Sequence, residues 1–305
     1  MQPVEYPEEL LEIDPMEKGS LIHDVLERWL DEQLAAGPPP PAQPWPPEAR
    51  ARMRELAEQA CDAAEQRGVT GYALLWRRDR PRIVADLERF VDADDTRRRE
   101  LGLVPLAAEW AFGIPGQPAP AVAIDLGDGR SVRVRGRIDR LDRCADGSLV
   151  VADYKTGSTY SYRGLGEDNP LGDGDKLQLA IYGLAVRDTQ QAAGVRSEYW
   201  FTSTRGEFKR IGYPLTDAVV ASLQRALTVA ADGIAAGRFP MRPPEPGWSM
   251  FTECRFCDPD DLGTAERYRD WERVRLAAEL RDYVAYMEPA VLTADADPDT
   301  PMATS

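Results

Sequence analysis

The chain has 305 residues, and its 52 acidic and 37 basic side chains give a formal net charge of −15 at pH 7. Hydrophobic residues make up 43% of it, which is ordinary for a globular protein and excludes wholesale disorder. No apolar run approaches the roughly 18 residues of a membrane span, and the acidic N-terminus does not resemble a signal peptide. Four cysteines are too few for a disulfide scaffold. We therefore expect a cytoplasmic protein without a membrane partner.

The first third of the chain is predicted to be helical. Apolar residues recur at helical spacing over 19–33, and the proline-rich stretch 37–47 forbids both helix and sheet. The charged segment 48–100 is expected to form a helical insertion in two pieces separated at Pro81. Its arginines at 97–99 form a local basic cluster on an acidic protein.

From residue 104 onward the pattern changes to alternating and buried apolar runs, which are typical of strands. Asp-Gly pairs separate consecutive runs and favour tight hairpins. The sequence therefore predicts an antiparallel meander, with strands at 104–112, 121–126, 131–143 and 148–156.

The remainder of the chain alternates helices and strands. A loop is expected at 157–175, helices at 176–186, 216–237 and 264–287, and strands at 197–203 and 207–215. The prediction is an α/β fold with a mixed central sheet flanked by helices. One domain is expected over 15–287, with flexible tails at 1–14 and 288–305.

The most informative segment runs from 137 to 157. Asp139 lies on one arm of a predicted hairpin, and Asp153 lies on the other arm, on the same strand face as Lys155. Two neighbouring carboxylates repel each other, and a divalent cation such as Mg²⁺ removes the conflict. Such a cation can activate a water and bind a phosphoryl oxygen, while the lysine stabilises charge on the phosphate. The alternative is a solvated strand face, because Asp-x-Lys alone is common by chance.

The segment GRIDRLDR…LVVADYKTG resembles two motifs of the PD-(D/E)XK nuclease superfamily, in particular the nuclease domains of the RecB and AddB type. A Gln-x-x-x-Tyr helix follows it, at Gln178 and Tyr182. A Gly-x-x-x-His-x-x-Leu-Glu helix precedes it, beginning at Gly19 and containing His23. The resemblance covers residues 15–275 and implies a restriction-endonuclease-like core.

The resemblance implies roles for single residues. His23, Asp139 and Asp153 correspond to metal ligands, with the backbone carbonyl of Tyr154 as a further ligand. Lys155 corresponds to the catalytic lysine, acting with the two aspartates. The implied cofactor is Mg²⁺ or Mn²⁺. For His23, the only histidine, the ordinary alternative is a packed helix residue.

Further residues are expected to line the site or to contact the DNA strand. Gln178 and Tyr182 correspond to residues that line the site and contact DNA, and Glu109 matches an acidic position on the first core strand. Arg137 is expected to contact DNA as part of a phosphate-binding stripe beside Asp139, shared with Arg133 and Arg135. A solvated strand balanced by acidic neighbours is the alternative. A locally basic cleft would allow the protein to bind DNA even though the net charge of the chain is negative.

Cys254 and Cys257 resemble part of the iron–sulfur staple of AddB-like nucleases. Two of the four expected cysteines are absent, since no cysteine precedes His23 and Gly263 occupies the later position. A [4Fe–4S] cluster normally needs four thiolates, so we expect a degenerate motif and no cluster.

The sequence thus predicts a metal-dependent deoxyribonuclease, an exonuclease of DNA repair or recombination. A helicase subunit is a candidate partner, because the chain has no Walker A motif for ATP-driven unwinding. One alternative is a catalytically silent nuclease-fold module that binds DNA or serves as a scaffold in a helicase–nuclease complex. Another is a metal-dependent enzyme with a substrate other than DNA.

Overall fold

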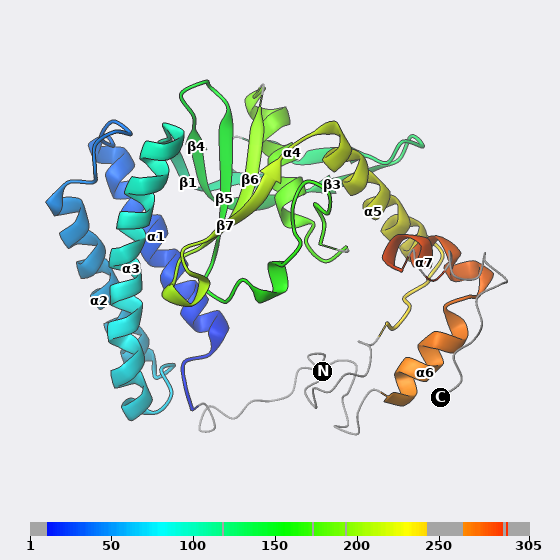
Figure 1. Cartoon of the computed structure of the whole chain (residues 1–305), viewed down its shortest axis with the longest axis horizontal. Helices are drawn as coiled ribbons and strands as arrows, with labels where there is room; N and C mark the ends of the chain where they lie inside the picture. Colours follow the sequence, from blue (N-terminus) through cyan, green and yellow to red (C-terminus); the bar gives the residue numbers. More distant parts are fainter. Residues whose placement is uncertain are drawn as a thin grey trace. The chain divides into compact units, whose positions relative to one another are not determined.

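The computed structural model describes residues 11–117, 119–172, 174–192, 194–242, 265–288 and 291. The chain divides into two compact units. The first comprises Met1–Ile124 and Ser131–Ala221, and the second Asp125–Arg130 and Ser222–Ser305. The elements of the first unit are shown in Figure 1, from dark blue to yellow-green.

Three long helices open the first unit: α1 (Pro15–Ala36), α2 (Pro47–Arg67) and α3 (Ala73–Leu101). The carboxylate of Asp14 caps α1 by accepting a hydrogen bond from the backbone N–H of Met16 at 2.8 Å. The predicted break at Pro81 is wrong, because this proline lies inside α3. The chain turns instead after Gly68, whose left-handed conformation (φ 71°) ends α2.

Five strands form a mixed sheet in the order β1-β4-β5-β6-β7. Their bounds are β1 (Val104–Phe112), β4 (Gly136–Arg143), β5 (Leu149–Lys155), β6 (Val195–Phe201) and β7 (Arg210–Pro214). Only β5 and β6 pair in parallel. This arrangement, with helices packed against it, confirms the predicted α/β fold class.

The predicted meander is wrong in its first half. The segment 113–135 leaves the main sheet, and β2 (Val122–Asp125) and β3 (Ser131–Val134) form a separate two-stranded sheet. Gly113 marks the departure: its φ is 67°, and its backbone lies so close to Ala121 and Arg135 that a Cβ would clash with both. β1 therefore pairs with β4, which is not its neighbour in sequence.

The two faces of the sheet carry different helices. Ala152, Tyr154 and Trp200 belong to the hydrophobic core that α1, α2 and α3 form. On the opposite face, α4 (Gln178–Gln190) packs on β5 and β6. Gly183 permits this close approach, because a Cβ there would lie 2.6 Å from the Ser197 Oγ. Short 3-10 turns at Tyr160–Tyr162 and Thr204–Gly206 follow β5 and β6.

A buried network of charges joins α3 to the sheet. Arg97 of α3 contacts Asp142 on β4 at 2.7 Å and Glu198 on β6 at 2.8 Å. Arg140 contacts Asp142 at 2.8 Å and Asp94 of α3 at 2.9 Å. All five side chains are essentially inaccessible to solvent. Burial raises the pKa of Asp142, but Arg140 and Arg97 outweigh it and lower the pKa overall. Arg97 is thus an internal structural residue and no part of a basic surface.

The second unit contains most of α5 (Asp217–Ala235), together with α6 (Ala265–Val274), a 3-10 turn at Ala278–Leu280 and α7 (Arg281–Met287). The single helix predicted at 264–287 is therefore two helices. α5 has a mean hydropathy of 1.2 and is long and apolar enough to cross a membrane by length and composition alone. This is weak evidence, because core helices of water-soluble proteins satisfy the same criterion.

Arg140→Met should lower the free energy of unfolding by about 3–5 kcal/mol, because it removes the arginine that contacts Asp94 and leaves the buried Asp142 with Arg97 alone. Urea unfolding checks this. Arg143→Met is the matched control: Arg143 is exposed on the same strand, and its replacement should change stability by less than about 0.5 kcal/mol. A loss of less than about 1 kcal/mol for Arg140→Met would contradict a structural role for the network.

Candidate active site and metal centre

Three carboxylates lie at one level across adjacent strands. Ala108 is opposite Arg140 and Trp110 is opposite Ile138, so Glu109 of β1 lies level with Asp139 of β4. Arg140 is opposite Ala152, so the next step along the pair of strands brings Asp139 level with Asp153 of β5. We call Glu109, Asp139 and Asp153 the acid row. Asp139 is the middle member, and its charge acts on both Glu109 and Asp153.

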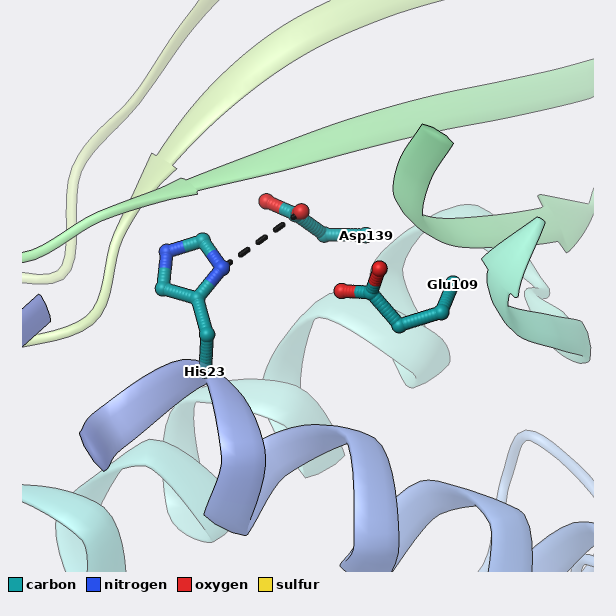
Figure 2. Close-up of side chains that lie close together, drawn as sticks. All are labelled: His23, Glu109 and Asp139. Carbon is teal, nitrogen blue, oxygen red and sulfur yellow. Dashed lines mark ion pairs between the residues drawn. The ribbon is translucent and has the colours of Figure 1, made fainter. Parts of the chain in front are cut away.

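His23 joins the acid row from α1. Its Nδ1 lies 3.4 Å from the Asp139 Oδ1, and Figure 2 shows the imidazole and the carboxylates of Asp139 and Glu109 pointing toward one another. One donor atom each from His23, Glu109 and Asp139 lies within 4.8 Å of the others. One nitrogen and several carboxylate oxygens in this space could hold a divalent cation.

Backbone geometry fixes two members of the acid row. The Tyr154 backbone N–H donates a hydrogen bond to the Asp139 Oδ2 at 2.5 Å, which holds that carboxylate against β5. Glu109 has a φ of 45°, which is rare for a residue with a side chain and lies within a strand. Such local strain is often found at functional sites, where the surrounding structure maintains it.

A chain of polar contacts continues from Asp153 onto α4. The Lys155 Nζ lies 2.5 Å from the Asp153 Oδ2 and donates to the Gln178 Oε1 at 3.3 Å. The Gln178 Nε2 donates to the Tyr182 Oη at 3.1 Å. Gln178 and Tyr182 are four residues apart and so lie on one face of α4. The structure therefore brings together the two helix residues and the Asp-x-Lys pair.

The electrostatics of the site reflect its crowded acids. Burial and the neighbouring Asp139 and Glu27 raise the pKa of Glu109 to about 7. Burial and Asp139 also raise the pKa of Asp153. Burial alone would lower the pKa of His23, but its hydrogen bond and attraction to Asp139 raise it overall. Without a cation, the site therefore holds protons at pH values where isolated acids would have lost them.

The arginines near the site are divided between two environments. Arg133, Arg135 and Arg137 are exposed, and Arg137 lies 3.6 Å from Glu109 across β1 and β4. Arg140 belongs to the buried network on the opposite face. The three arginines of the predicted phosphate-binding stripe are therefore all exposed. Their contact with DNA stays a prediction.

Cys254 and Cys257 lie outside the described residues, so the structure says nothing of the predicted degenerate staple. Sequence reasoning missed Tyr199, whose ring lies under the Lys155 ammonium at 4.9 Å. Tyr199 occupies the parallel strand position opposite Asp153, a pairing that the sequence pattern does not indicate.

Comparisons with known proteins identify the family of the chain. The family model of the PD-(D/E)XK nuclease superfamily matches residues 4–261. The B subunit of the ATP-dependent helicase/deoxyribonuclease of Moorella thermoacetica is 27% identical over 156 residues, which cover 49% of this chain and 13% of that protein. Its counterpart of the same name from Alkaliphilus metalliredigens is 26% identical over 185 residues, covering 57% and 15%. The chain thus spans about a seventh of the length of these relatives.

A solved structure, the crystal structure of SSO0001, aligns with 81% of this chain and 98% of its own at 17% identity. Its TM-score of 0.28 is too low to carry an argument. The family match covers more than half of the chain, and the sheet places the motif residues side by side. The chain belongs to the PD-(D/E)XK nuclease superfamily, which confirms the resemblance found in the sequence.

Glu109→Gln should stabilise the metal-free protein at alkaline pH. A carboxyl whose pKa rises from its ordinary value of 4.5 to about 7 on folding costs stability as the pH rises through that window. We expect the variant to gain about 1–3 kcal/mol at pH 8 and nothing near pH 4, where both states are protonated. Urea unfolding across pH measures this. Glu58→Gln, on the exposed face of α2, is the control, and an equal gain at every pH would refute the explanation.

Proposed function

We propose that the chain is a Mg²⁺- or Mn²⁺-dependent deoxyribonuclease, acting as an exonuclease in DNA repair or recombination. The observation that carries this proposal is the acid row with Lys155 beside it, on the strands that carry the superfamily motif. Burial and the charge of Asp139 raise the pKa values of Glu109 and Asp153, and such adjacent carboxylates are well suited to a divalent cation. An ammonium at the same edge is suited to a phosphate.

Residues of three elements would hold the cation: His23 of α1, Asp139 of β4, and Asp153 with the Tyr154 carbonyl of β5. Glu109 lies close enough to take part. When bound, a divalent cation activates water and neutralises charge on a phosphoryl oxygen. Asp139 lies in the middle of β4, Asp153 and Tyr154 lie near the C-terminal end of β5, and α1 passes close to that end. A Cβ on Gly19 would lie 3.8 Å from the Thr156 Oγ1.

Lys155 keeps its proton in this site. Burial lowers its pKa, but the attraction of Asp153 raises it overall, so the ammonium stays charged at neutral pH. Gln178 holds the Nζ by accepting a hydrogen bond from it, and Tyr182 holds Gln178 in turn. We infer that this fixed charge stabilises the negative charge that develops on the phosphate during hydrolysis.

We further propose that the chain works on DNA together with a helicase. Support comes from the names of its relatives, which are subunits of ATP-dependent helicase/deoxyribonucleases. The 305 residues contain no Walker A motif, so ATP-driven unwinding would require a motor outside them. The cytoplasm, which contains the bacterial chromosome, is the location that fits this role.

Cleavage of end-labelled DNA tests the nuclease directly. Wild-type protein should degrade linear single- or double-stranded DNA with Mg²⁺ or Mn²⁺ and not with EDTA. Lys155→Ala and Asp153→Asn should each lose at least about 100-fold in rate, because each removes a charge from the reacting centre. Lys209→Ala is the control, since Lys209 is exposed and paired with Glu207. Folded wild-type protein that binds Mn²⁺ yet cleaves nothing would point to a missing partner, whereas protein that neither binds Mn²⁺ nor cleaves would favour the scaffold alternative.

Affinity for Mn²⁺ should rise with pH, because the cation competes with protons on its ligands. With the pKa of Glu109 at about 7, loss of one proton between pH 6 and pH 8 strengthens binding by about tenfold. Titration calorimetry of the full chain measures this. Asp139→Asn should abolish binding, and Glu109→Gln should flatten the pH dependence. A pH-independent affinity in the wild type would exclude these residues as the ligands.

A further inference from the structure

A cavity of about 460 Å³ opens beside Lys155, on the α4 face of the sheet. Its volume lies in the range of about 300–1,000 Å³ that is common for small-molecule sites. Its lining includes aromatic and cationic side chains, together with three apolar residues, the amide of Gln178 and the carboxylate of Asp175. The aromatic ones are Tyr162, Tyr182 and Tyr199, and the cationic ones are Arg135, Lys155 and Lys176.

The aromatic side chains are packed against one another. The rings of Tyr162 and Tyr199 meet edge to face, with centroids 4.8 Å apart. Tyr182 packs edge to face on Phe112, and Gly136 leaves room for both, since a Cβ there would lie 3.0 Å from each ring. The aromatic wall is therefore formed before any ligand arrives.

Cations lie over two of these rings. The Lys155 Nζ is 4.9 Å from the centre of the Tyr199 ring, and the Lys176 Nζ is 5.4 Å from that of Tyr162. The loop that carries Tyr162 and Lys176 is anchored to the sheet, because the Tyr213 hydroxyl donates to the Pro170 carbonyl at 2.6 Å. Arg135 also lines the cavity, next to the β3–β4 junction.

We propose that this cavity binds one nucleotide of a single DNA strand, next to the phosphate that is cleaved. The base would stack on Tyr162 in place of the Lys176 ammonium, which would move to the adjoining phosphates and contact them together with Arg135. Aromatic side chains and a cationic groove are the two elements of single-strand recognition. A base paired within a duplex has both faces covered by its neighbours, so only an unpaired base can enter. This inference rests on the proposed nuclease function and specifies its substrate.

Binding measured in EDTA separates the cavity from catalysis. Fluorescence anisotropy with the full chain compares labelled octathymidylate with the same phosphodiester chain lacking all its bases. The wild type should bind the complete oligonucleotide about tenfold more tightly. Tyr162→Leu should reduce this ratio to about twofold or less, whereas Tyr72→Leu, at an exposed tyrosine on the first unit, should leave it unchanged.

Lys176→Ala should weaken binding of both oligonucleotides alike and leave their ratio intact, because a phosphate contact carries no information about the base. In this variant, the slope of log affinity against log salt concentration, measured between about 50 and 300 mM KCl, should be about one unit shallower than in the wild type. Lys209→Ala is its matched control and should change neither quantity. An unchanged ratio in Tyr162→Leu, or equal binding of both oligonucleotides by the wild type, would overturn the proposal.

Two further results separate this inference from the proposed function. A protein that cleaves DNA but shows no base preference retains its nuclease assignment and loses the nucleotide cavity. A protein that shows the Tyr162-dependent preference but cleaves nothing with Mg²⁺ or Mn²⁺ retains the cavity and loses the nuclease assignment. Octauridylate bound at least about tenfold more tightly than octathymidylate, with the same dependence on Tyr162, would replace DNA by RNA as the occupant.

Discussion

The buried network between α3 and the sheet determines which side chains form the site. Arg140 and Asp142 of β4, and Glu198 of β6, face α3 and must stay with Asp94 and Arg97, because an unpaired charge in that interior is costly. Side chains alternate along a strand, so their odd-numbered neighbours face the opposite side. A slip of one residue would bury the acid row and expose the network.

Where His23 of α1 approaches it, the same sheet carries a group of acids that repel one another. Glu109, Asp139 and Asp153 come from three strands, and the strand pairing, not mutual attraction, holds them together. Tyr154 links the two faces. Its backbone N–H holds Asp139, while its ring packs between Phe90 and Trp200 in the core. The stability of the core therefore maintains an arrangement of acids that is unfavourable without a cation.

Sequence reasoning found the parts of the site that depend on local pattern. The Asp-Gly turn and strand alternation predicted that Asp139 and Asp153 would meet, and helical spacing placed Gln178 with Tyr182. It failed where distant segments decide the outcome. The pairing of β1 with β4 depends on the excursion of 113–135, and the burial of Arg97 and Arg140 depends on partners from three elements. The loop that carries Tyr162 has no hydrophobic periodicity in its sequence, so nothing in the pattern indicated that this loop lines a cavity.

The buried network also constrains how this chain can diverge. Each arginine contacts two acids, so replacing Arg97 alone leaves Asp142 with only Arg140 and Glu198 with only the longer contact to Arg196 at 3.6 Å. An apolar core at this place could be equally stable, but every stepwise route to it passes through unstable intermediates. We therefore expect these five positions to be inherited together, while the acidic exterior drifts freely. In distant relatives, a change at one of them should be accompanied by changes at the others.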